Sequence, residues 1–570
     1  MTDIKNLPHG GRLIDLCVDE DRTSLLKKIT KDLPDITMND RQMCDLELIA
    51  NGSFSPLAGF MTQKDYEPVL DRMMLENQLV WPLPVCLDIN ETTARNLEAG
   101  QSIALRDPEG FLLAVMHVED IWPIDKNREA EKIYASTDAS HFGVDFLFHS
   151  TGDYYVGGPV EVISLPMHSD FKQLRMTPSE ARNLYKKLGW QRVVGFQSQK
   201  IIHRPEFEIT ISAMREARAN LLLMPVVGMT HPDNFDHYTR VNCYREAGRN
   251  YPPETHVLNL LSHSPRNAGL REALLHAVIS KNYGCSHHIL EQVDDLPNGN
   301  KKSTKPIAHK KLLEFSENYG EQIGISVMAY DKMVYLPFED EYRQKHKIPR
   351  GSKTIVFTGQ DIRDRIRTGR KMPEWASFPE IINCIQKAYP PPSKQGFTLF
   401  LTGLSGAGKS TIARVLYSKM MEIGNRPVSL LDGDIVRHHL SSELTFSKEH
   451  RDINVRRIGF VAQEITKNRG IAICAPIAPY ARTRREIRDM IAVHGGFIVV
   501  HVSTPIEECE RRDRKGMYAK ARAGLIKGYT GVDDPYEIPE FPEIRIDTSD
   551  ITPDEAAQQV LLYLGQKGFI

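Results

Sequence analysis

The sequence predicts an α/β protein of several domains, the last of which has a parallel sheet. A glycine-rich loop at residues 403–410 lies between a strand-like apolar run, 397–401, and a helix-like run, 411–416. Strand-like and helix-like runs alternate over residues 170–335, which is typical of an α/β sheet. The proline-rich stretch 388–396 can continue neither a helix nor a central strand, so it separates these two regions. For 570 residues, length alone favours about three to four domains.

The first two predicted domains differ in their patterns. Residues 1–169 form a β-rich domain of short strands and turns, of which 102–107 is one example. Residues 170–335 form an α/β domain in which 192–196 is a buried parallel strand and 269–282 is a helix. The run 80–87 is a further predicted strand of the β-rich domain. In the α/β domain, 220–227 is a second buried parallel strand and 212–219 is a further helix.

Two domains complete the chain. Residues 336–395 make a small α/β connector that carries a basic helix, 361–368, and ends in the proline-rich linker. Residues 396–570 make a nucleotide-binding domain, because the glycine-rich loop begins directly after the linker.

Composition excludes several classes of function. The net charge is −2, so neither nucleic acid nor a membrane surface is an expected partner. The eight cysteines form no C-x-x-C pair, which indicates reduced thiols rather than disulfides or a zinc site. No apolar run approaches the ~20 residues that span a bilayer, and the first residues lack an apolar signal core. We therefore expect a cytoplasmic protein.

The glycine-rich loop has the spacing G-x-x-x-x-G-K-[ST] of a phosphate-binding loop, or P-loop. Its N–H groups and the helix behind it favour an anion, Lys409 reaches the outer phosphates, and Ser410 holds Mg²⁺. The predicted cofactor is thus Mg²⁺ with ATP. The predicted phosphate-binding residues are Gly403, Leu404, Ser405, Gly406, Ala407, Gly408, Lys409, Ser410 and Thr411.

Two carboxylates follow the second strand of this domain, 428–431. Asp432 and Asp434 lie one residue apart, so on an extended backbone they point to opposite faces. One can serve the metal and the other can orient the acceptor hydroxyl, and phosphoryl transfer needs both. The alternative interpretation is an ordinary Asp-Gly-Asp turn. The position behind a P-loop favours the functional interpretation.

An acceptor-binding set follows, made of Arg437, Phe446, Arg451 and Asn454. Arginine binds anions through two parallel hydrogen bonds, and aromatic rings stack on bases. Two more arginines lie alongside, so spacing alone favours a solvated basic helix.

Residues 397–570 resemble adenosine-5′-phosphosulfate (APS) kinase. The segments that carry the resemblance are 431–434, 446–447, 451–459, 479–480, 512–518 and 521–531. The resemblance implies transfer of the γ-phosphoryl group of ATP to the 3′-hydroxyl of APS, giving 3′-phospho-APS (PAPS). It implies that Asp434 is the base or hydroxyl-orienting group and that Asp432 lies near the metal. It further implies an APS site of Arg437, Phe446, Arg451, Asn454, Ile477, Lys527 and Tyr529. It also implies a lid that includes Arg511, Arg514, Lys515 and Arg522.

Residues 1–388 resemble ATP sulfurylase, which makes APS from ATP and sulfate. The segments that carry this resemblance are 40–48, 52–61, 225–230, 237–240, 281–285, 367–369 and 373–375. It implies a PUA-like first domain, a Rossmann-like nucleotidyltransferase second domain and a homo-oligomer, with a hexamer through this region as one arrangement. The order of the two parts is similar to that of fungal and some bacterial fusions.

The sulfurylase motifs themselves are altered. The family run Q-x-R-N-P-x-H-x-x-H corresponds here to residues 197–206, in which Gln197 and His203 remain. Gln199 replaces the sulfate-binding arginine, and Glu206 replaces the second histidine. The family run G-R-D-H-A-G is lost at 291–296, whereas Arg266 is retained. Losing one preorganised donor costs roughly 10²–10³ in rate.

These residues predict an APS kinase with an inactive, structural or regulatory sulfurylase-like region. The main alternative is a bifunctional PAPS synthase with both activities. A nucleotide-binding assembly protein would need a broken kinase site, yet its motifs are intact. A generic P-loop nucleoside kinase leaves the segments 451–454 and 515–531 unexplained.

Overall fold

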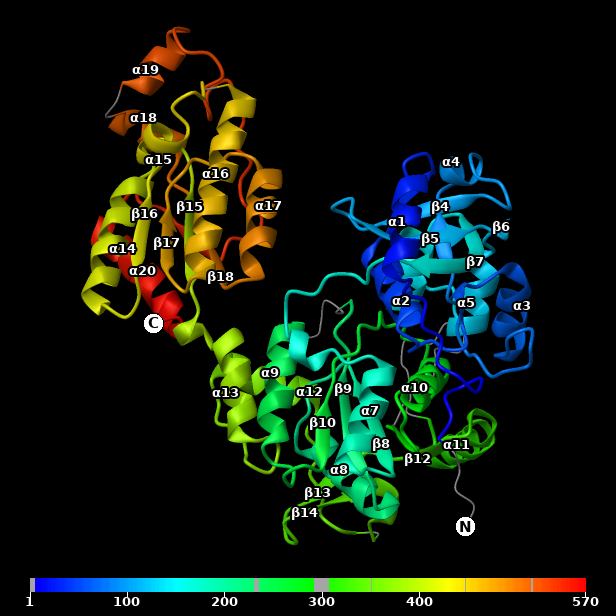
Figure 1. Cartoon of the computed structure of the whole chain (residues 1–570). Helices are drawn as coiled ribbons and strands as arrows, with labels where there is room; N and C mark the ends of the chain where they lie inside the picture. The colour runs from blue at the N-terminus through cyan, green and yellow to red at the C-terminus, as the bar shows by residue number, and fades with distance from the viewer. Residues whose placement is uncertain (1–5, 230–234, 292–306, 350, 446, 514–515) are drawn as a thin grey trace. The chain divides into compact units, whose positions relative to one another are not determined.

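The computed structural model describes all residues except 1–5, 230–234, 292–306, 350, 446 and 514–515. The side chains of Arg367 and Asp434 also lie outside the description. The chain divides into two compact units. The first comprises Met1–Phe357 and Pro373–Cys384, and the second comprises Thr358–Met372 and Ile385–Ile570. Each unit is described by itself (Figure 1).

The first unit begins with a mostly antiparallel sheet in the order β1-β4-β5-β7-β2, with β3 and β6 also paired to β7. Its strands are β1 (Asp35–Thr37), β2 (Gly59–Phe60), β3 (Leu87–Ile89), β4 (Ser102–Arg106), β5 (Leu112–His117), β6 (Asp120–Pro123) and β7 (Tyr154–Val162). Its helices are α1 (Glu20–Ile29), α2 (Asp40–Ala50), α3 (Gln63–Arg72), α4 (Glu91–Ala94), α5 (Lys126–Tyr134) and α6 (Phe142–His149). The prediction of a β-rich first domain is confirmed.

The predicted strand 80–87 is wrong. Val80 forms only an isolated bridge to Met74, and regular pairing begins at Leu87. Pro82 and Pro84 lack the backbone N–H that a paired strand must donate, so this apolar segment crosses the core as irregular chain.

The second sheet of this unit is parallel throughout, in the order β10-β9-β8-β11-β12. Its strands are β8 (Val193–Ser198), β9 (Asn220–Pro225), β10 (His256–Leu258), β11 (His287–Leu290) and β12 (Ser326–Ala329). Its helices are α7 (Pro178–Leu188), α8 (Arg204–Ala217), α9 (His237–Gly248), α10 (Leu270–Asn282) and α11 (His309–Ile323). A hairpin of β13 (Met333–Leu336) and β14 (Glu341–Gln344) follows. The predicted α/β domain is confirmed, although α8 begins eight residues earlier than the helix predicted at 212–219.

The second unit is built on one parallel sheet in the order β16-β17-β15-β18-β19. Its strands are β15 (Phe397–Thr402), β16 (Val428–Leu431), β17 (Ile471–Cys474), β18 (Gly496–Val502) and β19 (Ile544–Ile546). Its helices are α14 (Lys409–Ile423), α15 (Gly433–Leu440), α16 (Lys448–Lys467), α17 (Ala481–Ala492), α18 (Ile506–Arg512), α19 (Met517–Arg522) and α20 (Pro553–Gln566). The basic helix α12 (Gly359–Thr368) belongs to this unit, α13 (Pro379–Ala388) spans the division, and the single turns η1 (Lys172–Leu174), η2 (Lys345–Lys347) and η3 (Pro392–Lys394) are 3₁₀.

Both faces of this sheet are buried, which is why its strands are almost wholly apolar. Leu399 and Leu401 point to one face and pack with α14 and α20, whereas Phe400 points to the other and packs with α16 and α17. Figure 1 shows these helix pairs on opposite sides of the strands. This sandwich fixes the carboxyl ends of the strands at one edge, where ligands bind in open α/β sheets.

None of the described helices combines the length and apolar character that a bilayer crossing requires. The eight cysteines all lie in the described part of the chain, and none of them forms a disulfide there.

Candidate active sites

The P-loop connects β15 to α14, as predicted. Gly406 and Gly408 have φ angles of +76° and +103°, in the left-handed region that favours glycine. A Cβ added to Gly403 would lie 2.3 Å from the carbonyl oxygen of Val502, so only glycine fits there. The chain therefore turns sharply in front of the N-terminus of α14, where backbone N–H groups bind phosphate.

Lys409 is held at this loop. It lies in the first turn of α14, and its side chain folds back so that Nζ donates a hydrogen bond to the carbonyl oxygen of Leu404 at 2.7 Å. The residue is only 7% exposed. Ser410 follows it in the same turn. The P-loop thus holds the positive charge of Lys409 close to where the outer phosphates of a nucleotide would bind.

Asp432 comes directly after β16, at the edge of the sheet where β15 leads into the P-loop. It is buried, with 7% of its surface exposed. The prediction that Asp432 and Asp434 flank an extended backbone is wrong, because α15 already begins at Gly433. Asp434 therefore lies on the first turn of a helix, and the side-chain direction expected for a strand does not apply to it.

Arg451 forms the centre of a hydrogen-bonded network on α16. Its guanidinium donates to Thr530 Oγ1 at 2.6 Å, to Asp534 Oδ2 at 2.8 Å and to the Tyr480 hydroxyl at 3.1 Å. Tyr480 in turn donates to the same Asp534 oxygen at 2.7 Å. Burial raises the pKa of Tyr480, so it stays a neutral donor. The arginine is fixed by a segment about 80 residues further along the chain.

Asn454 lies one turn after Arg451, so both face the same side of α16. It is 6% exposed, and among the described residues its Oδ1 has no hydrogen-bond partner. Arg437 on α15 donates instead to the carbonyl oxygens of Leu444 and Thr445, at 3.2 and 3.0 Å. Arg451 and Asn454 therefore make a polar pair, while Arg437 braces the loop between α15 and α16.

The loop after β17 meets the start of the P-loop. The carbonyl oxygen of Ile477 accepts from Thr402 Oγ1 at 2.6 Å and from the N–H of Gly403 at 3.4 Å. Thr402 Oγ1 also lies 3.0 Å from the Tyr536 hydroxyl. The backbone of Ile477 thus contacts the start of the P-loop, and its role in an APS site stays a prediction.

A cavity of about 650 Å³ opens between the P-loop and the carboxyl end of β18. Burial lowers the pKa of His501 in its wall to about 4, with help from Arg545 and Arg484, so this imidazole is neutral. The lining residues include Leu404, His501, Thr504, Asp534, Tyr536 and Arg545. Only Leu404 could be predicted from the sequence. The lining residues come from four separate segments, and no local sequence motif connects them.

The residues expected in the lid are spread over the surface. Arg511 pairs with Glu508 and Arg522 pairs with Glu510, each at 2.6 Å. Lys527 is exposed, and the ring of Tyr529 packs edge-on against Tyr518, 5.1 Å between centroids. The contact with the P-loop is made by Tyr518, whose hydroxyl donates to the carbonyl oxygen of Ser405 at 2.9 Å.

Several predicted residues lie outside the described part of the chain. They are Phe446, Arg514, Lys515, the side chain of Asp434 and residues 292–296 of the altered sulfurylase run. Their roles stay predictions from the sequence.

In the first unit, the altered sulfurylase motif lies at the end of β8 and the start of α8. Gln197 is buried in β8, and its amide nitrogen donates to the His276 carbonyl oxygen at 2.8 Å and to Ser280 Oγ at 3.0 Å. His203 precedes α8, and its Nδ1 lies 2.8 Å from Ser377 Oγ. Gln197 and His203, the two residues that match the family motif, therefore both make hydrogen bonds within the fold.

Glu206 caps the start of α8. Its carboxylate accepts a hydrogen bond from the N–H of His203 at 3.0 Å, which closes a capping box at the start of α8. Glu291 lies near it, since burial raises the pKa of Glu291 to about 7, Glu206 shifts it in the same direction and Lys200 opposes them. Gln199 is half-buried and directly precedes Lys200 in the sequence. Two carboxylates and one ammonium group thus lie where the motif would place cations.

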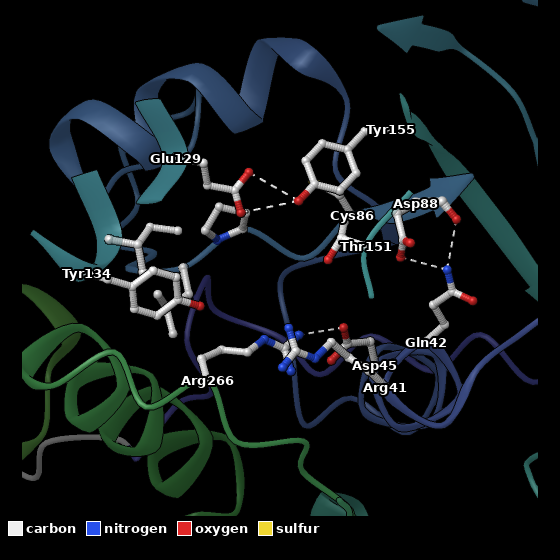
Figure 2. Close-up of a pocket in the computed structure, with 13 residues that line it drawn as sticks. Arg41, Gln42, Asp45, Cys86, Asp88, Glu129, Tyr134, Thr151, Tyr155 and Arg266 are labelled. Atoms are coloured by element: carbon white, nitrogen blue, oxygen red, sulfur yellow. Dashed lines mark hydrogen bonds and ion pairs between the residues drawn. The ribbon is translucent and has the colours of Figure 1, made fainter. Parts of the chain in front are cut away.

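Arg266 is not at this motif but in a small internal cavity of about 40 Å³ (Figure 2). It donates to Asp45 Oδ2 at 2.5 Å, and both side chains are buried. Figure 2 shows Arg41 beside this pair and Glu129 on the opposite wall, where it accepts from Tyr155. Burial and Arg266 together lower the pKa of Arg41 to about 10. Gln197 and His203 do not line this cavity.

Comparison with known proteins then decides the family. Family models match a PUA-like domain at residues 6–165, ATP-sulfurylase at 172–388 and adenylylsulphate kinase at 395–547. A sulfate adenylyltransferase from Phaeosphaeria nodorum is 44% identical over 569 residues, covering 99% of both chains. The chain belongs to the family of ATP sulfurylase–APS kinase fusions.

Other members of this fusion family have the same extent. A sulfate adenylyltransferase from Aspergillus oryzae is 42% identical and covers 99% of both chains. A solved structure titled as a hexameric APS kinase from Thiobacillus denitrificans superposes with a TM-score of 0.81 at 38% identity, again over 99% of both chains. The predicted combination of a β-rich first domain, a sulfurylase-type α/β domain and a P-loop kinase domain is confirmed.

One expectation finds no support in these comparisons. The altered motif predicted that the sulfurylase-like region is inactive, yet the full-length relatives from fungi are named sulfate adenylyltransferase. The fusion family as a whole therefore fits a bifunctional chain at least as well as a kinase with an inactive first unit.

Proposed function

We propose that the second unit is an adenylylsulfate kinase, which transfers the γ-phosphoryl group of ATP to the 3′-hydroxyl of APS and releases PAPS and ADP. The observation that carries this proposal is the meeting of three features at one edge of the sheet. They are the P-loop with Lys409, the buried Asp432 and the Arg451–Asp534 network.

The phosphate end of the reaction is supported by the P-loop. Its N–H groups and Lys409 surround the outer phosphates of ATP with positive charge, which stabilises the charge on the transferring group. Because Lys409 is already bonded to the loop carbonyl of Leu404, little reorganisation is needed when ATP binds. This unit therefore supplies positioning and electrostatic stabilisation.

The residues present fit Mg²⁺ as the cofactor that accompanies ATP. Ser410 offers a hydroxyl oxygen and Asp432 a carboxylate oxygen, the hard donors that Mg²⁺ prefers. Asp432 comes directly after β16, and Ser410 lies in the first turn of α14, which the P-loop connects to the carboxyl end of β15. When bound, the ion neutralises negative charge on the β- and γ-phosphates.

The acceptor end is supported by Arg451 and Asn454. A guanidinium fixed by Asp534, Thr530 and Tyr480 presents a planar set of donors of the kind that binds phosphate and sulfate groups. The Asn454 amide lies on the same face of α16 and can read the nucleotide. From the sequence, Asp434 is the group that orients the 3′-hydroxyl.

A product assay tests the kinase. Purified full chain with ATP, Mg²⁺ and APS should yield PAPS and ADP in equal amounts, resolved by anion-exchange chromatography. Adenosine and guanosine in place of APS should give no phosphorylated product. Turnover of nucleosides without turnover of APS would instead establish a general nucleoside kinase and overturn the proposal.

Sulfate adenylyltransferase activity of the first unit is the second candidate function, and the names of the full-length relatives favour it. Against it stand Gln199 in place of a cationic donor and the carboxylates of Glu206 and Glu291. Sulfate and pyrophosphate are both anions, so these carboxylates would repel them unless they are protonated or paired. Lys200 and Arg204 are the cations that could take over the binding.

The reverse reaction separates the two possibilities. Lys409→Ala chain is supplied with APS and pyrophosphate, and ATP is followed by luciferase luminescence. ATP formation that disappears in Lys200→Ala and Arg204→Ala establishes a bifunctional chain with a rearranged anion site. No ATP above background means that the first unit has lost this reaction. In that case Gln199→Arg together with Glu206→His tests whether the motif alone is responsible.

We further infer that the chain assembles into a homo-oligomer, on the basis of the hexameric relative. Light scattering coupled to size-exclusion chromatography tests this, since a mass equal to that of one chain would exclude it.

A further inference from the structure

A histidine-rich cluster lies where the segment after β10 leads into α10, next to Gln197 of the altered motif, which donates to the carbonyl oxygen of His276. His263 comes from the segment that precedes the helix, and Glu272 and His276 come from the helix itself, one turn apart. Residues four apart on a helix share one face, so the last two side chains lie side by side. One nitrogen of each imidazole and one carboxylate oxygen all lie within 4.8 Å of one another.

The separation between two of these atoms is informative. His263 Nε2 and Glu272 Oε1 are 3.4 Å apart, which is long for a charge-assisted hydrogen bond. A tetrahedral Zn²⁺ ion with bonds of about 2.1 Å holds neighbouring ligand atoms about 3.4 Å apart. The pair is thus spaced like two ligands of one ion.

One imidazole of the cluster has a nitrogen that calls for a partner. Among the described residues, His276 Nε2 has no hydrogen bond and is buried. His263 Nδ1 is also without a partner there, but an ion held between His263 and Glu272 would use Nε2 and leave Nδ1 as it is. His263 itself is 0% exposed, and the two imidazole rings meet edge to face with centroids 5.4 Å apart. An unsatisfied buried polar atom destabilises a fold, so such atoms call for a ligand.

The carboxylate of Glu272 is fixed in direction. Its Oε1 accepts from the N–H of Arg266 at 2.8 Å, and its Oε2 accepts from the N–H of Ala268 at 3.2 Å. Hydrogen bonds of this kind orient a carboxylate that binds a metal. His276 is the partly exposed member of the cluster, so an ion can enter from its side.

We propose that His263, Glu272 and His276 bind one divalent transition-metal ion, of which Zn²⁺ suits the donor set best. Two imidazoles and one carboxylate are a common protein set for Zn²⁺, with water completing the tetrahedron. The ion ties the segment before α10 to the helix. That segment also carries Arg266 and its ion pair with Asp45, so the ion stabilises the first unit.

Metal content tests the proposal in the full chain. Protein stripped with a chelator, then dialysed against Zn²⁺ in excess Mg²⁺ and desalted, should retain one equivalent of zinc by mass spectrometry. His263→Gln and His276→Gln should each lose it. The matched control is His256→Gln, because His256 in the same unit also has a buried, unpartnered Nδ1 but stands outside the cluster. Control protein should retain zinc like the wild type.

Two further readouts guard against a variant that merely fails to fold. The four tryptophans all lie in the first unit, so tryptophan fluorescence should show a higher unfolding midpoint with zinc in the wild type and no shift in His263→Gln. Co²⁺ bound to the wild type should give the visible absorption of a tetrahedral site. A wild type that retains no zinc, or histidine variants that retain as much as the control, would overturn the proposal.

Discussion

At the carboxyl ends of their parallel sheets, the two units present different charges to an anionic substrate. In the second unit, Lys409 and Arg451 are buried or half-buried cations held in place by loop and side-chain oxygens. In the first unit, the corresponding edge carries Glu206 and Glu291 near Lys200. ATP, APS, sulfate and pyrophosphate are all anions, so the same substrate class meets attraction in one unit and partial repulsion in the other.

The two edges also differ in how far their polar groups are committed to the fold. Gln197 bonds to a helix carbonyl, and Glu206 caps α8, so both stabilise the first unit directly. In the second unit, the P-loop turns through left-handed glycines, and Asn454 Oδ1 has no partner among the described residues. At the first edge these polar groups are thus held by contacts within the fold, whereas at the second edge a buried amide oxygen remains available to a ligand.

Removing the positive charge of the P-loop should have the largest effect, because it removes the charge by which the second unit differs from the first. Lys409→Ala should lower kcat/KM of the kinase by about 10³, because a preorganised cation at the phosphates is lost. Coupled detection of ADP measures this. Lys419→Ala on the exposed part of α14 is the matched control and should be unaffected. A loss smaller than tenfold would show that the loop backbone alone carries the phosphate charge.

The base assigned from the sequence gives the next largest effect. Asp434→Asn should lower kcat by about 10², since general-base groups contribute 10²–10⁴, and should leave ATP binding nearly unchanged. Single-turnover kinetics and equilibrium ATP titration separate the two quantities. Asp489→Asn on the exposed face of α17 serves as control. Near-wild-type turnover would transfer the role of base to another group.

The substitution Arg451→Gln tests whether the second unit binds APS through a fixed cation. Loss of charge-assisted hydrogen bonds of about 1.5–3 kcal/mol should raise KM for APS by about 10- to 100-fold and KM for ATP far less. Steady-state kinetics with each substrate varied in turn gives both constants. Arg457→Gln on the same helix, α16, should change neither constant, because Arg457 pairs with Glu443 in the loop before that helix. An equal rise in both constants would mean that Arg451 supports the fold rather than APS.

The smallest effect concerns the buried charges of the first unit. Burial raises the pKa of Glu129 to about 6, from an ordinary value of 4.5, despite the opposing hydrogen bonds from Tyr66 and Tyr155. A carboxyl whose pKa is raised in the folded state stabilises it while protonated. The free energy of unfolding should therefore fall by about 2 kcal/mol as pH rises from below 4.5 to above 6.

Glu129→Gln should remove this slope, because the amide does not ionise. Denaturant unfolding followed by tryptophan fluorescence reports on the first unit alone, since all four tryptophans lie there. Glu131→Gln, on the exposed side of the same helix, is the control. Identical pH dependence in wild type and Glu129→Gln would show that Arg41 and Arg266 keep this carboxylate charged at all pH values tested.

Local patterns predicted the parts of the molecule that depend on local backbone chemistry. The P-loop, the strand before it and the helix after it follow from glycine spacing and apolar runs within about 20 residues. The strand predicted at 80–87 was wrong because its two prolines prevent regular pairing, although the apolar residues Val80, Trp81, Leu83 and Val85 are buried. The extended backbone expected from Asp432 to Asp434 was wrong because α15 already begins at Gly433.

The sequence by itself determined the family, the kinase motif and the replacement of cationic residues at Gln199 and Glu206. Only the tertiary structure decided which charges meet. Arg451 pairs with Asp534 across 83 residues, and Arg266 pairs with Asp45 across 221. Pairings of this kind depend on how separate segments pack, and burial then strengthens each charge interaction by removing water. Spacing along the chain carries no information about such contacts, which is why the histidine cluster beside α10 became visible only in the folded protein.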